Sequence, residues 1–332
     1  MTAFKTIKGV PVKTVAGGQP NAYPSPFEGE LFYDSDGAGA FKFVGAAGAG
    51  AWSSGGNLNT GRDNAGGAGR TNTAALAIGG LTTAVVGVVE SYDGSSWTEI
   101  ADLNTARYGL IGAGTQTSAI VQGGSPPITG ATEIWNGSGW TEVSDLNTAR
   151  LRLGSSNAGT TTATIAFGGI ATVPLAITES WDGSSWTEVG DLNTPRSQLG
   201  GFGISTSAIA AAGENALPTT VTVNAELWNG SSWTEVGNVN TARRLLGSSG
   251  DTGTSGLIFA GGVPGSFNGA VTESWNGSSW TEVNDMATGR YAVGSNGSSA
   301  SALVTGGSVG DYGIATVEEW QIPQAIKTID LS

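Results

Sequence analysis

Short apolar runs separated by turn residues make up most of this chain. In a representative stretch they cover residues 107–114, 118–124, 131–135 and 140–143. The runs are rich in β-branched, aromatic and small residues, with Gly, Asn-Gly or Pro between them, and none is long enough for a helix of 3.6-residue period. The pattern predicts four short antiparallel strands in this stretch and an all-β chain.

The stretch recurs, and each copy has a tryptophan followed ten residues later by an arginine. Successive arginines are 45, 43, 46, 47 and 47 residues apart. A period of about 40 to 50 residues is typical of propeller blades or of helical pairs, and four strand-like runs per copy favour a blade. The pairs are Trp52/Arg62, Trp97/Arg107, Trp140/Arg150, Trp186/Arg196, Trp233/Arg243 and Trp280/Arg290.

A glycine turn separates the third and fourth runs of five copies. Asp-Gly and Asn-Gly accept the positive φ that a tight hairpin needs. Three of these turns also read Asn-x-Ser, the glycosylation acceptor of secreted proteins, but we favour the hairpin role. The turns are Asp93-Gly94, Asn136-Gly137, Asp182-Gly183, Asn229-Gly230 and Asn276-Gly277.

These repeated residues resemble the kelch family of β-propellers over roughly residues 52 to 320. Each copy has an Arg before the first run, a Gly-Gly pair after the second, Glu-x-Tyr or Glu-x-Trp in the third and a Trp opening the fourth; the fourth copy departs with Ala212-Gly213. The resemblance implies blades arranged radially around a central channel and nothing specific about chemistry. The Gly-Gly pairs are Gly79-Gly80, Gly123-Gly124, Gly168-Gly169, Gly261-Gly262 and Gly306-Gly307.

The number of copies predicts how the ring closes. Trp52 precedes any complete copy, and the last third run, ending at Trp320, is followed by Pro323 and has no fourth run. We therefore expect a six-bladed propeller over residues 51–323, with four antiparallel strands per blade, in which a strand at Trp52 completes the last blade. Such closure leaves no open sheet edge between the first and last blades.

One arginine and one glutamate recur in every copy. A charge that recurs in each blade is a poor candidate for a single active site, and a semi-buried Arg bonded to Glu and to carbonyl oxygens would hold a strand and a loop together. We expect a structural role, with pairing either within a blade or between neighbouring blades. The pairs are Arg62/Glu90, Arg107/Glu133, Arg150/Glu179, Arg196/Glu226, Arg243/Glu273 and Arg290/Glu318.

The 11 tryptophans allow two interpretations. They could form a carbohydrate-stacking surface, but all of them occupy repeated positions. Large rings are the expected filler where each sheet packs on the next. We expect core packing.

Composition excludes several kinds of site. The chain has neither cysteine nor histidine, which rules out Ser-His-Asp and Cys-His catalysis and His-ligated metals. Asp34-Ser-Asp36-Gly37 resembles the opening of a calcium loop, but Gly45 stands where the bidentate Glu belongs. We expect no metal, no cofactor and no catalytic residue.

Charge and hydropathy bear on partners. All of the net charge of −13 falls on residues 43–326, which lack lysine, so nucleic acid would be repelled. The chain has no run of eighteen apolar residues and no charged-then-apolar leader, so we expect no membrane insertion and no ordinary signal peptide.

The ends of the chain differ from the repeats. Residues 1–12 resemble an extended arm and residues 28–44 a hairpin, so we expect residues 1–50 to form a docking segment. The tail, residues 324–332, carries Ile326-Lys-Thr-Ile329, an echo of Phe4-Lys-Thr-Ile7. These segments could pair with each other, with the propeller rim or with a neighbouring protein.

Residues 28 to 56 also resemble the entry regions of structural proteins from tailed bacteriophages, especially marine phages, through Gly29-Glu-Leu-Phe-Tyr-Asp34, Phe41-Lys-Phe-Val44 and a later Trp. A cysteine-free chain rich in Gly, Ala, Ser, Thr and Asn fits a virion appendage. The resemblance implies location in the virion, contact with other virion proteins through the arm, and membership of a symmetric oligomer.

Specific contacts are expected where the repeats differ. The loops between second and third runs vary in every copy, at residues 81–88, 125–130, 170–177, 214–223, 263–270 and 308–315, and variation on a fixed scaffold is where binding is placed. Drift alone would also produce it. The candidate binding residues are Pro126, Pro127, Pro174, Pro218, Pro264, Phe267 and Tyr312.

Three functions fit the sequence. The first is a non-enzymatic phage component in tail, fibre, baseplate or capsid, binding a host-surface protein, a glycan or another virion protein. The second is a bacterial kelch-type interaction module, cytoplasmic or extracellular. The third is a glycan-active propeller enzyme. A copper enzyme of this kind would need Cys and His, which the chain lacks. A sialidase-like site would need Arg70, Arg152 and Arg244 to converge.

Overall fold

The chain folds into two compact units, residues 1–50 with 322–332 and residues 51–321. The structure is a computed structural model, and it describes residues 6–7, 10–11, 13–15, 31–34, 41–46, 50–215, 220–310 and 312–329. Each unit is described separately below.

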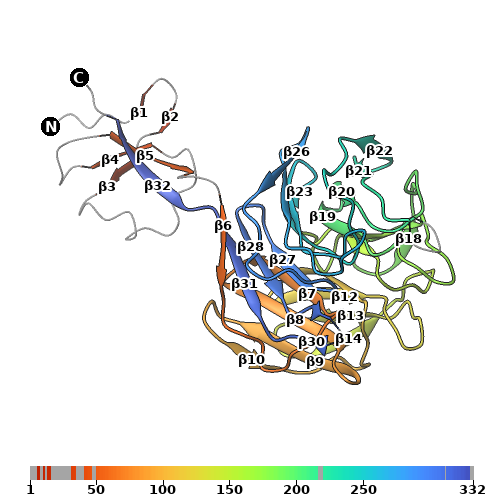
Figure 1. The fold of residues 1–332 in the computed structure, drawn as a ribbon. Coiled ribbons are helices and arrows are strands. Elements are labelled where there is room, and N and C mark those ends of the chain that lie inside the picture. The colour runs from red at the N-terminus through yellow and green to blue at the C-terminus, as the bar shows by residue number, and fades with distance from the viewer. Residues whose placement is uncertain are drawn as a thin grey trace. The chain divides into compact units, whose positions relative to one another are not determined.

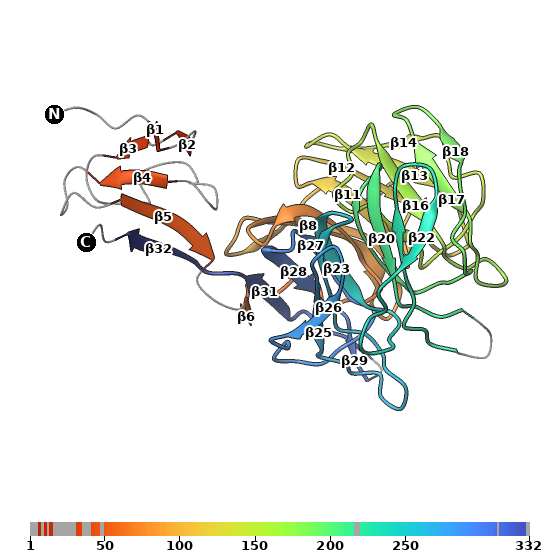
Figure 2. The ribbon, with the colours of Figure 1, turned by 90° about the horizontal axis from the view of Figure 1, so that it is seen from above.

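The larger unit is a six-bladed β-propeller of four-stranded antiparallel sheets (Figures 1 and 2). Five blades follow chain order: β7 (Gly66–Thr71), β8 (Ala74–Leu81), β9 (Val85–Tyr92) and β10 (Trp97–Glu99); β11 (Ile111–Thr115), β12 (Ser118–Gln122), β13 (Thr132–Trp135) and β14 (Trp140–Val143); β15 (Gly154–Ser155), β16 (Thr164–Phe167), β17 (Thr178–Trp181) and β18 (Trp186–Glu188); β19 (Gly200–Ile204), β20 (Ser207–Ala211), β21 (Ala225–Trp228) and β22 (Trp233–Val236); β23 (Gly247–Thr252), β24 (Ser255–Phe259), β25 (Thr272–Trp275) and β26 (Trp280–Val283).

The sixth blade is closed by the N-terminal side of the chain, as the sequence predicts. Its strands are β27 (Gly294–Gly297), β28 (Ser301–Thr305), β31 (Val317–Gln321) and β6 (Ala51–Ser54). In the antiparallel pair of β31 and β6, Trp320 lies opposite Trp52. A short hairpin of β29 (Ser308–Val309) and β30 (Tyr312–Gly313) occupies the loop between β28 and β31.

The turns between third and fourth strands differ in detail from the tight hairpin expected. Positive φ falls on the glycine, as at Gly94 with φ 93°, and not on the residue before it. Asp93 acts through its side chain, whose Oδ1 accepts the backbone N–H groups of Ser95 and Ser96, each over 2.8 Å. The loop is thus four residues long between Tyr92 and Trp97.

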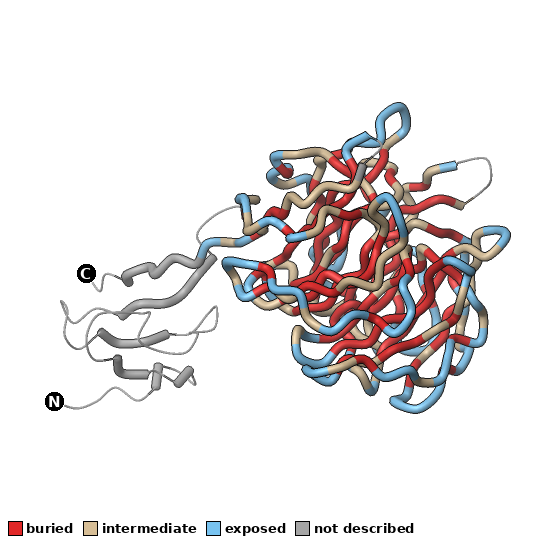
Figure 3. Tube along the Cα trace, turned by 90° about the horizontal axis from the view of Figure 1, so that it is seen from below, coloured by how far each residue is buried: buried red, intermediate tan, exposed pale blue. Residues whose placement is uncertain are grey.

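The core lies in the seams between blades, where aromatic rings of one blade pack on apolar side chains of the blade before it. Figure 3 marks the buried residues along the chain trace in red. Trp228 and Trp233, for example, pack with Ile165 and Phe167 of the preceding blade. Ten tryptophans are buried, and only Trp52, on the outer strand of the closing blade, is partly exposed. The prediction that tryptophan fills the core is confirmed.

First strands of neighbouring blades lie side by side around the axis. Small residues permit this approach: a Cβ on Gly67 would collide with the backbone of Ser295 in the sixth blade. Ser155 Oγ donates to the Gly112 carbonyl over 3.0 Å, and the Ser248 amide donates to Ser295 Oγ over 3.1 Å. The first strands are therefore tightly packed around the axis of the ring.

The smaller unit contains a two-stranded sheet of β1 (Thr6–Ile7) and β2 (Val10–Pro11). It also has a four-stranded sheet in the order β3 (Lys13–Val15), β4 (Leu31–Asp34), β5 (Phe41–Ala46) and β32 (Gln324–Ile329). The β4–β5 pair is antiparallel, as expected for the hairpin. The tail pairs with β5 through β32, so it belongs to the same compact unit as the first fifty residues.

Candidate functional site

The six repeated Arg–Glu pairs all form within a blade, which resolves the alternative left open by the sequence. The arginine stands before the first strand, the glutamate lies in the third, and both are buried. Arg196–Glu226 and Arg243–Glu273 are the closest pairs. The other distances are 2.5 Å for Arg62–Glu90, 2.5 Å for Arg150–Glu179, 2.7 Å for Arg290–Glu318 and 3.1 Å for Arg107–Glu133.

Each pair also fastens the segment that enters its blade. Glu179 accepts the amide N–H of Asn147 over 2.6 Å and that of Thr148 over 3.3 Å, while Arg150 donates to the Thr148 carbonyl over 3.2 Å. Burial lowers the pKa of the guanidiniums and the paired glutamates oppose that shift, at Arg107, Arg150, Arg196, Arg243 and Arg290. The arginine and glutamate of each pair therefore interact with each other and the glutamate with the entering backbone, which is a structural role.

The same arginines join neighbouring blades through their backbone. The second residue of the Gly-Gly or Ala-Gly pair in each blade donates its N–H to the arginine carbonyl of the next blade, as Gly80 does to Arg107 over 3.0 Å. The other bonds are Gly124 to Arg150, Gly169 to Arg196, Gly213 to Arg243, Gly261 to Arg290 and Gly307 to Arg62. The pair in the fifth blade is therefore Ala260-Gly261, with φ of 61° and 99°, and the assignment to Gly261-Gly262 was one residue late.

A closed ring of backbone hydrogen bonds surrounds the axis two residues after each arginine. Every residue of this ring has positive φ, between 49° and 65°, and donates its N–H to the carbonyl of its counterpart in the preceding blade over 2.7–2.8 Å. We call these six residues the mouth ring. They are Asn64, Gly109, Arg152, Gln198, Leu245 and Ala292.

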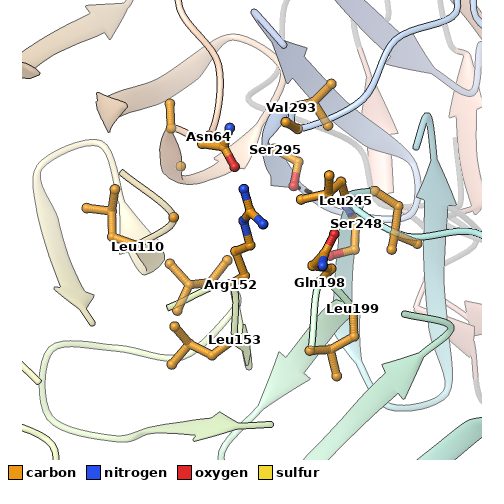
Figure 4. Close-up of a pocket in the computed structure, with 16 residues that line it drawn as sticks. Asn64, Leu110, Arg152, Leu153, Gln198, Leu199, Leu245, Ser248, Val293 and Ser295 are labelled. Carbon is orange, nitrogen blue, oxygen red and sulfur yellow. Dashed lines mark hydrogen bonds between the residues drawn. The ribbon is translucent and has the colours of Figure 1, made fainter. Parts of the chain in front are cut away.

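The mouth ring surrounds a hollow of about 70 Å³ on the axis (Figure 4). Leucine and valine side chains form much of its wall, and Ser248 and Ser295 lie deeper. Figure 4 shows the Arg152 guanidinium within the hollow, pointing toward Asn64. Arginine is the one charged residue among those that line it, and none of the lining residues is acidic.

The opposite end of the axis is filled by side chains that cross it. Arg70, at the end of the first strand of blade one, donates to the Ala158 carbonyl of blade three over 2.5 Å and pairs with Asp251 of blade five at 3.3 Å. Asn157 of blade three also reaches blade five, donating to the Ser248 carbonyl over 3.3 Å. Blades one, three and five are not neighbours, so these bonds span the axis.

The candidate binding loops lie on the same face as the mouth ring, because second-to-third and fourth-to-first connections leave a meander together. Pro126, Pro127, Pro264 and Phe267 are exposed, and Pro174 is half-buried. Pro218 lies outside the described residues, and for Tyr312 the structure describes only its strand pairing with Val309. In blade one, β8 and β9 reach Leu81 and Val85, so most of the expected loop 81–88 is strand.

Apolar exposure is concentrated on that face. The large hydrophobic side chains exposed in the described part of the chain are Ile128 at 40%, Val173 at 55%, Phe267 at 55% and Val309 at 40%. All four belong to second-to-third loops, one in each of blades two, three, five and six. We call them the loop-tip residues.

A chain of contacts links the hollow to one loop tip. Gln198 of the mouth ring donates to Glu214 over 2.9 Å, and Arg244 donates to the same carboxylate over 2.6 Å. The Arg244 guanidinium lies 5.4 Å from the Phe267 ring centre, and that ring is 5.5 Å from Tyr291. The three non-repeated arginines do not converge, since Arg70 lies at the far end of the axis and Arg244 is held by Glu214.

The mouth ring was missed by sequence reasoning because its residue types share nothing across the blades. Its signal was positional: the second residue after each repeated arginine differs in every copy, while the arginine itself does not. No family model matches the chain, and no curated protein shows significant similarity to it. Within the described residues, no helix is long and apolar enough to cross a membrane, and no cluster of acidic side chains is suited to hold a metal ion.

Proposed function

We propose that this protein is a non-enzymatic structural and binding component of a tailed-phage virion, with a kelch-type propeller as its binding platform. The observation that carries the proposal is the concentration of the loop-tip residues on one face of the propeller. Exposed apolar side chains that recur on one face are typical of interaction surfaces. The partner is a host-surface protein or glycan, or another virion protein.

The fixed part of each blade supports a binding role over a catalytic one. Each buried repeated arginine is paired with the glutamate of its own blade, and Arg70, Arg152 and Arg244 lie apart, which does not suit a sialidase-like arginine cluster. Release of sugar from sialosides or other glycans by the purified protein would overturn the non-enzymatic assignment.

Virion location is tested by mass spectrometry and cryo-EM of purified particles. We expect the chain in the particle; its absence there would favour the bacterial interaction module. Because β32 pairs with β5, attachment is tested with a variant that lacks residues 1–50 and 322–332 together. This variant should keep a folded propeller and lose incorporation into the particle, and undiminished incorporation would contradict docking through the smaller unit.

The binding face is tested by changing two loop tips, Val173→Ser and Phe267→Ser, in the full chain. Particles with this protein should adsorb to host cells more slowly, or should lose the virion partner. Thr187→Asp, an exposed site on an outer strand, is the matched control and should leave adsorption unchanged. Equal behaviour of the two kinds of variant would contradict the assignment of this face.

A further inference from the structure

Among the described residues of the propeller, Arg152 is the one arginine whose side chain has no protein partner. Six arginines pair with the repeated glutamates, Arg70 pairs with Asp251 and Arg244 with Glu214. Across the described part of the chain, the Arg152 side chain forms neither an ion pair nor a hydrogen bond, and its Nε is buried without a partner. A partly buried charge without a counter-ion is costly, so this guanidinium is suited to an anion from outside.

The fold places Arg152 so that it can meet such an anion. Its backbone is fixed at both ends by the mouth ring, through bonds to Gly109 and Gln198. A Cβ on Gly109 would lie 3.4 Å from Arg152 Cγ, so the arginine stem runs within van der Waals reach of the neighbouring ring residue. Figure 4 shows the charged end of that stem inside the hollow, and Arg152 is partly exposed.

Two side-chain amides also line the hollow. Asn64 donates one N–H to Asp63 over 2.8 Å, and Gln198 donates one to Glu214. A side-chain amide has two N–H donors, so each residue retains one for a ligand. Asp63 and Glu214 do not line the hollow, and each accepts bonds from neighbouring side chains.

The charge and size of the hollow select the anion. It offers one cation on a propeller of strongly negative net charge without lysine, and the ring N–H groups are already used. One guanidinium would neutralise only half of the charge of a dianionic phosphate, whereas a carboxylate matches one guanidinium in charge and in planar geometry. A volume of about 70 Å³ exceeds the roughly 15 Å³ that one water needs and admits a carboxylate with a small apolar or sugar attachment.

We propose that the mouth ring binds a carboxylate group through Arg152, with Asn64 and Gln198 as additional donors. The group belongs either to an acidic sugar or to a peptide, and the rest of that molecule lies over the loop face. The inference rests on the proposed function in using the same face, but it names a chemical group that the loop tips do not require.

The test is ligand-observed NMR on the full chain with two matched probe pairs, N-acetylglycine against N-acetylglycinamide and galacturonate against galactose. We expect at least one acid to bind with a dissociation constant of about 1 mM and neither neutral partner to bind. Binding of both acids supports the carboxylate as the determinant, galacturonate alone supports an acidic glycan, and N-acetylglycine alone supports a peptide carboxylate.

Two variants copy residues that the ring already accepts elsewhere. Arg152→Gln, which introduces the residue type found at position 198, should weaken the acid about tenfold or more because a charge-assisted pair is lost. Ala292→Leu, the residue type at position 245, should block the hollow while keeping the arginine. Arg70→Gln removes a cation from the closed end of the axis and should leave binding unchanged.

The proposal is overturned if neither acid binds the folded protein, or if Arg152→Gln binds the acids as well as the original chain does. Adsorption in the loop-tip variants is a separate readout. Failure of carboxylate binding with a persistent loop-tip effect would remove this inference alone, and loss of the loop-tip effect with intact carboxylate binding would remove only the assignment of the loops.

Discussion

The amide N–H of Gly307 donates to the carbonyl oxygen of Arg62 over 3.0 Å, joining the last blade to the first. The equivalent bond joins each of the remaining pairs of neighbouring blades. Closure of the ring therefore uses the same contact as the internal seams. Because the blades share this frame, positions where one blade departs from the others are natural controls.

Trp280 lacks a bond that its counterparts make. Trp186, Trp233 and Trp52 donate their indole N–H to a threonine of the preceding blade over 3.2, 2.9 and 2.9 Å. The threonine position before Trp280 holds Ala225, and the Trp280 indole nitrogen is buried without a partner. Ala225→Thr should raise the free energy of unfolding by about 1 kcal/mol, measured by denaturant titration.

Val89→Thr is the control for that substitution. It introduces a threonine at the same strand position in the seam between the first and second blades, where the Trp140 indole already donates to the Ala101 carbonyl over 3.0 Å. The new hydroxyl would lack that indole as a partner, so Val89→Thr should destabilise the propeller. A loss of stability in both variants would contradict the role assigned to the missing bond.

The buried Arg–Glu pairs should not contribute equally. Arg150 donates to Glu179 and to two carbonyls, whereas Arg107 contacts Glu133 at 3.1 Å and none of its guanidinium nitrogens has a hydrogen-bond partner. Arg150→Met should lower the free energy of unfolding by about 3 kcal/mol, because a buried carboxylate loses its partner. Arg107→Met should lower it less, and equal losses in chemical denaturation would refute this ranking.

Acid should weaken two of the hairpin turns. Hydrogen bonds from Ser96 and Ser95 lower the pKa of Asp93 to about 2, and bonds from Ser184 and Ser185 lower that of Asp182 to about 2, from 3.8. A lowered folded-state pKa stabilises the fold above the unfolded value, and this contribution disappears as the pH falls from 3.8 through 2. Unfolding free energies measured across that range should decline.

Asparagine tests this cause directly, since Asn136 Oδ1 accepts equivalent bonds without titrating. The double variant Asp93→Asn/Asp182→Asn should therefore lose less stability between pH 4 and pH 2 than the original chain. An unchanged acid slope would exclude these two carboxylates as its source.

Alkali should act at the closing seam. Burial and a hydrogen bond to Glu319 raise the pKa of Tyr92 from 10.0 to about 12. A raised folded-state pKa contributes stability that is complete below pH 10 and is lost as the pH rises through 12. Tyrosinate absorbance should contain a late-titrating component that is absent from Tyr92→Phe, a variant that also lacks the 2.6 Å bond to Glu319. A titration unchanged by this substitution would contradict the assignment.

The repeat predicted the blades well because each one is specified locally. Strand alternation, turn glycines and the tryptophan-to-arginine interval set each sheet, and the unpaired Trp52 and Trp320 indicated how the ring closes. The choice between intra-blade and inter-blade pairing depends on the three-dimensional arrangement, because the positions of Arg62 and Glu90 in the sequence allow either kind of pair. The shifted pair at Ala260-Gly261 arose because a third glycine, Gly262, follows and the pattern alone cannot choose the register.

The mouth ring was beyond the reach of residue patterns for a different reason. It is built from backbone groups in a left-handed conformation, and residues as unlike as Leu245 and Arg152 adopt it because their neighbours fix them. That Arg152 lacks an acidic partner among the described residues is likewise a property of the assembled ring. Local sequence specifies what repeats, while the position of this guanidinium emerges only when six blades meet.

Closure through β6 also determines when the ring can close during synthesis of the chain. Ser53 and its hydrogen-bond partner Glu319 are 266 residues apart, so on the ribosome the first propeller strand is made long before its partner. Until β31 emerges, β6 is an unpaired edge and the nascent ring is open, a condition that favours association with other chains. Translation products that end before β31 should therefore aggregate more readily than a chain that includes this strand.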